Sequence, residues 1–131
     1  MNKRFLKIGT MLAALAVGLG AFGAHALKNL VAPDALVVFE TAVRYQMYHA
    51  FAIMVTGILF KDFTTKKVLM AGELFLLGII LFSGSLYLLT YIKTIGADNF
   101  LWVGAITPLG GVCFIVGWML LCASFFGRER K

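Results

Sequence analysis

Four long stretches of this chain carry almost no charge, and they constrain its fold more than any other feature of the sequence. They cover about residues 5–27, 45–60, 68–92 and 100–126, and their only formal charges are those of Lys7 and Glu73. A helix needs about 20 mostly apolar residues to cross a hydrocarbon core about 30 Å thick. Only 14% of the residues are charged, against about 25% in a soluble domain. We therefore predict a single all-α domain, an integral membrane four-helix bundle.

The distribution of basic residues predicts how this bundle is oriented. Four crossings would place nine of the twelve Lys and Arg residues on one side of the membrane, and basic residues in short loops favour the cytoplasmic side. The nine are Lys3, Arg4, Lys7, Lys61, Lys66, Lys67, Arg128, Arg130 and Lys131, and the other three are Lys28, Arg44 and Lys93. The pattern predicts a multi-pass protein of a bacterial cytoplasmic (inner) membrane with both termini in the cytoplasm. The net charge of +6 then reflects orientation, and no nucleic acid is expected as a partner.

A secretory signal peptide is the competing interpretation of the N-terminus. The chain begins with basic residues, continues with an apolar run, and offers Ala24, His25 and Ala26 as a cleavage motif. The apolar run over residues 8–24 has 17 residues, which is longer than the usual hydrophobic region of about 7–15 residues. Cleavage would also place the two termini on opposite sides of the membrane. We therefore expect residues 5–27 to remain as the first span.

The segment before the second apolar stretch also has helical signals. Pro33 followed by Asp34 is a typical helix start, and Glu40 and Arg44 are spaced so that they can pair on one helix face. We predict a short interfacial helix over residues 33–44 on the outer side, which could run straight into the second span.

Small residues recur in the apolar stretches at helical spacing. Lipid tails are as apolar as leucine, so close backbone approach at small residues is what favours helix association in a membrane. Pro108 lacks a backbone donor, and within a continuous helix it would free the carbonyl of Gly104, for which Thr107 or a serine of the third stretch could be the partner. The residues we assign to packing are Gly20, Gly23, Gly78, Gly84, Pro108, Gly110, Gly111 and Gly117.

Polar residues inside the spans are the first place to look for function. The sequence places His25, Gln46, His49, Ser83, Ser85 and Thr107 at a similar depth near the outer face. One hypothesis makes them a pocket for a small polar ligand or a quinone headgroup, or a proton relay. The other makes them hydrogen-bond partners that hold the helices in register, and we favour it because nothing in the set is specific to catalysis.

More specific sites, such as a haem, a zinc ion or a disulfide, have little support in the sequence. His25 and His49 could be the two axial ligands of a b-type haem. A zinc site has less support, because neither histidine has a cysteine or carboxylate partner at zinc-ligand spacing. Cys113 and Cys122 are nine apart on one predicted helix and face nearly opposite ways. We expect Glu73 either to snorkel to the inner interface or to pair there with Lys66 or Lys67. No catalytic residue, metal site or cofactor is predicted.

Five short segments are similar to a known family. They are GAFGAHAL at 20–27, YQ followed by HA at 45–50, LFSGSLY at 81–87, TPLGG at 107–111, and GW at 117–118. Their order and spacing resemble the domain of unknown function 423 family, which includes the mitochondrial transmembrane protein 256 group. The resemblance implies a four-span integral membrane protein and implies no activity.

These observations favour a non-enzymatic accessory subunit or small-ligand binding module. Its partners would be the lipid bilayer and either further copies of the chain or a larger membrane complex. An oligomeric transporter or channel for small solutes is the first alternative, because four helices leave little room for a cavity in one copy. A quinone or haem redox component is the second.

Overall fold

The computed structural model describes residues 1–126, so the predicted cytoplasmic positions of Arg128, Arg130 and Lys131 lie outside the described residues. The described part is helical and contains no strand, which confirms the predicted all-α class. Its elements are α1 (Lys3–His25), the 3-10 turn η1 (Leu27–Asn29), α2 (Pro33–Leu59), α3 (Lys66–Gly78), the π-helical segment η2 (Ile79–Ser83), α4 (Gly84–Thr94), the 3-10 helix η3 (Asp98–Ala105) and α5 (Thr107–Ser124).

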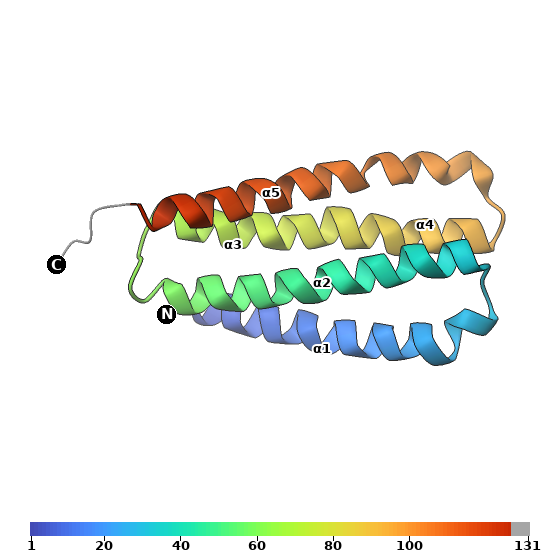
Figure 1. Ribbon diagram of the computed structural model, residues 1–131, viewed down its shortest axis with the longest axis horizontal. Helices are drawn as coiled ribbons and strands as arrows, with labels where there is room; N and C mark the ends of the chain where they lie inside the picture. Colours follow the sequence, from blue (N-terminus) through green and yellow to red (C-terminus); the bar gives the residue numbers. More distant parts are fainter. Residues whose placement is uncertain (127–131) are drawn as a thin grey trace.

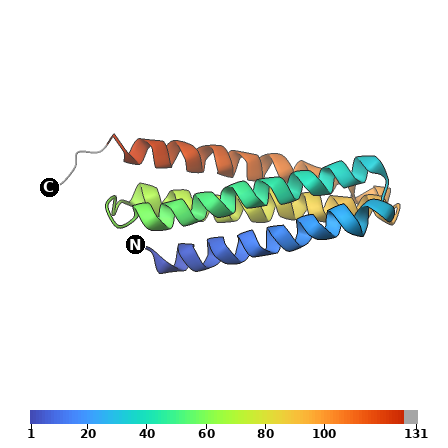
Figure 2. The same ribbon diagram turned by 60° about the horizontal axis from the view of Figure 1, so that its bottom comes forward.

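These elements form four roughly parallel rods, one of which is α3, η2 and α4 in sequence (Figure 1). The α2 rod and the α3–α4 rod lie side by side in the centre, and α1 and α5 lie on opposite sides of them (Figure 2). We call the end that carries Lys3, Lys61 and Lys66 the basic end. The other end, which carries η1 and the turn into η3, is the far end.

Helix α2 joins two segments that the sequence predicts separately. The interfacial helix expected over residues 33–44 continues without a break into the second apolar stretch and ends at Leu59. Pro33 occupies the first turn, where its missing N–H is not needed. Gln46 therefore lies at the middle of this helix, and not close to its outer end. Glu40 and Arg44 form no ion pair with each other in the described structure.

Three helical stretches are long and apolar enough to cross a membrane: Lys3–Asn29, Lys66–Thr94 and Asp98–Ser124. Together with the helical fold they confirm a membrane helical bundle. Helix α2 is not among the three, because polar residues such as Gln46 and His49 lower its hydropathy. Both of these side chains are buried against the other helices, so α2 carries them without exposing them to lipid. The predicted number of four spans stays a prediction.

Several glycines lie where another backbone or ring comes very close. A Cβ added at Gly9 would lie 2.8 Å from the carbonyl oxygen of Ala50 on α2. A Cβ at Gly110 would lie 2.7 Å from the Cβ of Phe82. Gly23 faces the ring of Phe39, and Gly117 faces the ring of Phe75. Such contacts bring helices together where apolar burial alone would not.

The other residues assigned to packing have more room. A Cβ at Gly20 would be 3.4 Å from Val43, and one at Gly111 would be 3.9 Å from Phe82, which are ordinary contacts. Gly84 meets only its own helix, at 4.0 Å. Gly78 belongs to the close set, because a Cβ there would overlap the ring of Phe114. The close set also includes Gly9 and Gly72, which the sequence does not single out.

The last predicted span divides into two kinds of helix. Residues 98–105 form η3, and α5 begins at Thr107 with Pro108 in its first turn. A first-turn proline leaves no broken hydrogen bond behind it. The α-helix expected to continue through Pro108 is therefore interrupted before it, and the hydroxyl of Thr107, one expected partner for the carbonyl of Gly104, lies against Ser85 instead.

The basic end is fastened by polar contacts between distant residues. Glu73 forms an ion pair with Arg4 of α1, so the expected pairing of Glu73 with Lys66 or Lys67 is wrong. Lys67 instead donates to the backbone oxygen of Ala123, at 3.4 Å. The side chain of Asn2 caps α1, and its backbone N–H donates to the oxygen of Gly57, at 2.8 Å.

Candidate functional site

The six candidate residues do not converge on one cavity. Gln46 is 1% exposed and connects three rods. Its Nε2 donates to the backbone oxygen of Leu12 on α1, at 2.9 Å, and its Oε1 accepts from the hydroxyl of Tyr87 on α4, at 2.7 Å. Both ends of the amide are thus occupied by protein groups, and α1, α2 and α4 are connected through one side chain.

His49 lies about one turn nearer the basic end, within a group of aromatic rings. Its Nδ1 is 2.8 Å from the backbone oxygen of Tyr45, and its Nε2 is 3.3 Å from the indole Nε1 of Trp118. A carbonyl only accepts and an indole N–H only donates, so this ring is neutral with its proton on Nδ1. Its face stacks on Phe114, with ring centroids 3.4 Å apart. The imidazole therefore acts as a packed part of the core.

The three hydroxyl residues join the α3–α4 rod to its neighbours. Ser83 donates to the backbone oxygen of Ala42 on α2, at 2.7 Å. Ser85 lies 2.7 Å from the hydroxyl of Thr107 on α5. Ser83 is the last residue of the π-helical segment η2 and Ser85 lies two residues further on, in α4, and π-helical segments are frequent at functional sites. Here the end of η2 bonds to α2 through Ser83, and the first turn of α4 bonds to α5 through Ser85.

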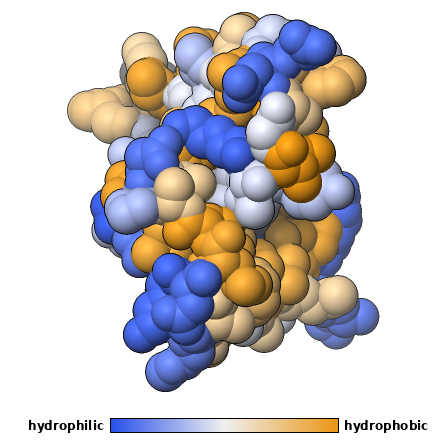
Figure 3. All heavy atoms as spheres, turned by 90° about the vertical axis from the view of Figure 1, so that its right-hand side faces the viewer, coloured by the Kyte–Doolittle hydropathy of each residue, from blue (hydrophilic) through white to orange (hydrophobic). Residues whose placement is uncertain are grey.

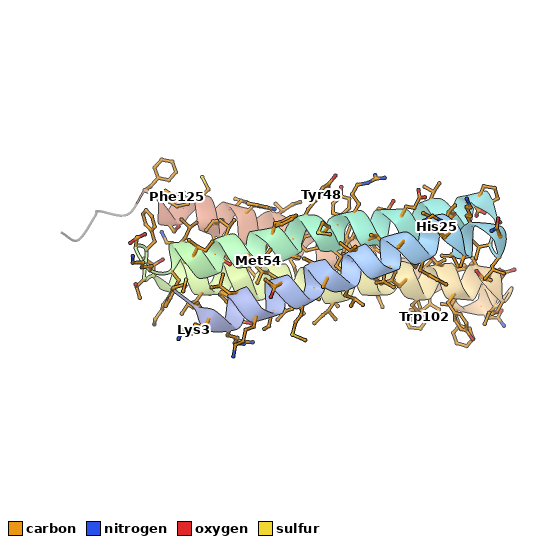
Figure 4. The ribbon with its side chains drawn as sticks, turned by 90° about the horizontal axis from the view of Figure 1, so that it is seen from below. Lys3, His25, Tyr48, Met54, Trp102 and Phe125 are labelled. Atoms are coloured by element: carbon orange, nitrogen blue, oxygen red, sulfur yellow. The ribbon has the colours of Figure 1, made fainter. Side chains whose placement is uncertain are left out.

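His25 is remote from the other candidates. It is exposed at the far end of α1 (Figure 4). Because Gly23 packs on Phe39 and Gly9 on Ala50, His25 lies level with about residue 37 of α2. His49 is twelve residues further along, which is about 18 Å at the helical rise of 1.5 Å per residue. The two histidines are therefore too far apart to ligate one haem iron.

These contacts favour the interpretation that the polar residues hold the helices in register. No buried side-chain nitrogen or oxygen in residues 1–126 lacks a hydrogen-bond partner. Two pockets open toward the far end, and none of the six candidate residues lines either of them. The buried polar groups therefore bond to other protein groups, and these bonds connect the helices to one another.

The first pocket is a groove between α1 and α2. Its volume is about 270 Å³. The lining residues are Gly20, Gly23, Phe39, Glu40, Val43 and Arg44. The hollow exists because the α1 glycines have no side chains. Glu40 and Arg44 of α2 lie along its edge.

The second pocket lies among polar groups at the far end, where hydrophilic and hydrophobic side chains are mixed on the surface (Figure 3). It has a volume of about 330 Å³ and includes Asp34, Lys93 and Asp98. Lys93 donates to Asp34, at 2.8 Å. This hydrogen bond and the positive charge of Lys93 lower the pKa of the Asp34 carboxyl below its ordinary value.

Two partners of the candidate residues are absent from the predicted set. Tyr87 and Trp118 complete the contacts of Gln46 and His49. Both lie in segments that carry the family resemblance, LFSGSLY and GW. Membership of these segments is the sequence signal that could have added the two residues to the candidate site. Only the arrangement of the helices shows which polar residue each one meets.

Comparisons with known proteins agree with this architecture. Residues 19–111 match the family described as "Protein of unknown function (DUF423)". UPF0382 membrane protein SAB0533 of Staphylococcus aureus (strain bovine RF122 / ET3-1) is 44% identical over 95% of this chain and 96% of its own length. UPF0382 membrane protein YwdK of Bacillus subtilis (strain 168) is 44% identical over 93% of this chain and 95% of its own length. A search of solved structures gives no match. The chain belongs to the DUF423 family.

Proposed function

We propose that this DUF423 protein is a non-enzymatic accessory subunit of the membrane, which acts through its outer surface. The observation that carries the proposal is the closed interior. Every buried polar side chain of residues 1–126 has a protein partner, and aromatic rings such as Phe75, Phe114 and the imidazole of His49 fill the space between α2, α3 and α5.

The same observation bears on the alternatives. Transport through one copy needs a polar path along the bundle, and the polar groups that could line it are bonded to one another or to backbone. Binding of a small ligand by Gln46 and His49 would have to displace those bonds. The geometry thus favours the accessory role over a ligand-binding module, a single-copy channel or a redox component.

The orientation belongs to the same proposal. With α2 as the fourth span, the short loops follow the positive-inside rule, both termini lie in the cytoplasm, and the far end faces outward across a bacterial cytoplasmic membrane. Fusions of a cytoplasm-active and an export-active reporter to the C-terminus test this. Signal from the cytoplasm-active fusion is the expected result, and signal from the export-active one would contradict it.

The function itself is tested by extracting a tagged chain with its native lipids into polymer nanodiscs, followed by mass spectrometry of everything retained. We expect one defined assembly in which the chain has a fixed stoichiometry. Purified chain in liposomes should pass no small solute. A chain that is isolated alone and carries solute flux would overturn the proposal in favour of a transporter, and a retained quinone or pigment would favour the redox alternative.

A further inference from the structure

The groove between α1 and α2 presents two opposite charges at a depth where its other lining is apolar. Val43 lies against Gly20, and Phe39 against Gly23. Arg44 follows Val43 in the chain, and Glu40 follows Phe39. The two charged residues therefore lie level with Gly20 and Gly23 of α1. No charged residue occurs in α1 between Lys7 and its end.

The depth of these charges makes them unusual. Gly20 lies 13 residues after Lys7 and eight before Lys28, which is about 20 Å and about 12 Å along a helix. Both charged residues are exposed. Neither takes part in an ion pair within residues 1–126. Ionisable side chains at membrane depth are costly, and they normally face a partner inside the membrane.

We propose that this groove is the interface between two copies of this chain, related by a two-fold axis along the membrane normal. A two-fold interface uses the same patch on both copies, so the patch must be complementary to itself. Glu40 and Arg44 meet this requirement, because the carboxylate of each copy can face the guanidinium of the other. They are one helical turn apart, about 6 Å. The arginine side chain leans toward the N-terminus of its helix, and therefore toward the level of Glu40.

The shape of the groove fits the same occupant. The hollow of about 270 Å³ over Gly20 and Gly23 gives a side chain of the second copy a place to insert. Small residues are the usual means by which membrane helices approach closely. This inference goes beyond the accessory role, and its test uses purified protein alone, so the failure of either proposal can be recognised separately.

The test uses charge reversal and energy transfer between donor-labelled and acceptor-labelled copies in phosphatidylethanolamine–phosphatidylglycerol liposomes. We expect the wild type to associate, and Glu40→Arg or Arg44→Glu alone to weaken association about tenfold or more, because like charges then face each other. Mixing the two variants should restore it to within about threefold of the wild type, since each Arg again faces a Glu.

A second pair of variants covers the case in which a charge reversal inserts or folds poorly. Gly20→Leu fills the groove and should abolish association. Gly18→Leu is the matched control, because a Cβ added there meets nothing within 4 Å, and it should associate like the wild type. Association that is absent in the wild type, that is unchanged by either reversal, or that is not restored on mixing would overturn the proposal. So would a loss on Gly18→Leu equal to that on Gly20→Leu. Retention of phospholipid by monomers that depends on Arg44 would identify the groove as a lipid site instead.

Discussion

The two halves of the bundle differ in how they are filled, although polar contacts such as Arg4 to Glu73 also occur at the basic end and close glycine contacts such as Gly110 to Phe82 also occur toward the far end. Toward the basic end, a cluster of buried apolar side chains packs against glycines. Phe5, Phe75 and Ile53 are its largest fully buried members. Toward the far end, the helices are joined by single hydrogen bonds such as Ser83 to Ala42 and Ser85 to Thr107. Both pockets also open in this half.

This difference indicates where the packing is tightest and where hollows remain on the surface. A half that is filled by rings and close backbone contacts tolerates little change. A half that is joined by separate hydrogen bonds leaves surface hollows between its helices, and those hollows can receive a partner. The family resemblance falls largely on the polar residues of the central and far parts.

The largest expected effect comes from adding one methyl group to α1 in the half toward the basic end. Gly9→Ala places a Cβ 2.8 Å from the carbonyl oxygen of Ala50, and a backbone atom cannot turn away as a flexible side chain can. We expect a loss of about 1–3 kcal/mol in the free energy of unfolding, measured by denaturant titration in bicelles. Gly20→Ala is the matched control in the far half, because its Cβ would make an ordinary contact with Val43. An equal loss in both variants would remove the contrast between the halves.

A smaller effect is expected from one hydroxyl in each half. Ser83→Ala removes the bond to the oxygen of Ala42 on another helix, and such bonds between membrane helices are worth about 0.6 kcal/mol on average. Ser124→Ala removes a bond to Leu121 of its own helix. We expect only the first variant to be less stable in the same titration. A greater loss in Ser124→Ala would show that hydrogen bonds between helices are no more important in the far half.

The smallest effect concerns the exposed ion pair at the far end. The bond from Lys93 lowers the pKa of Asp34 in the folded protein, so the pair adds stability above the carboxyl's ordinary pKa of 3.8. This contribution is lost as the pH falls through the lowered folded value. Carbon NMR titration of Asp34 should show a low pKa in the wild type, and a return toward 3.8 in Lys93→Met. An unchanged pKa in Lys93→Met would contradict the pairing.

Much of the fold follows from the sequence for physical reasons. The uncharged stretches predict the helices, because each must satisfy its backbone within the membrane. The start at Pro33 follows from local chemistry in the same way. The sequence left open whether the helix over residues 33–44 runs straight into the second span, as it does in α2, and the π-helical segment η2 could not be predicted, since both depend on what neighbouring helices contact. The shift of Gln46 to mid-bundle is a consequence of that continuity.

The candidate site was harder to predict than the fold. The sequence singled out Gln46 and His49 as polar residues inside a span, and both are buried in α2. Spacing could not show that His25 lies on an exposed face of α1. It also could not show that His25 and His49 lie about 18 Å apart along the bundle by the helical rise. The choice between a pocket and a set of helix contacts needed the partners, namely Leu12, Tyr87 and Trp118.

The central claim is that the buried polar residues hold the helices together. The most direct test is a double-mutant cycle of Gln46→Leu and Tyr87→Phe, read as the free energy of unfolding in bicelles. Because the two side chains share one hydrogen bond of 2.7 Å, we expect a favourable coupling of about 0.6 kcal/mol or more. A coupling of zero, with both variants as stable as the wild type, would contradict the account.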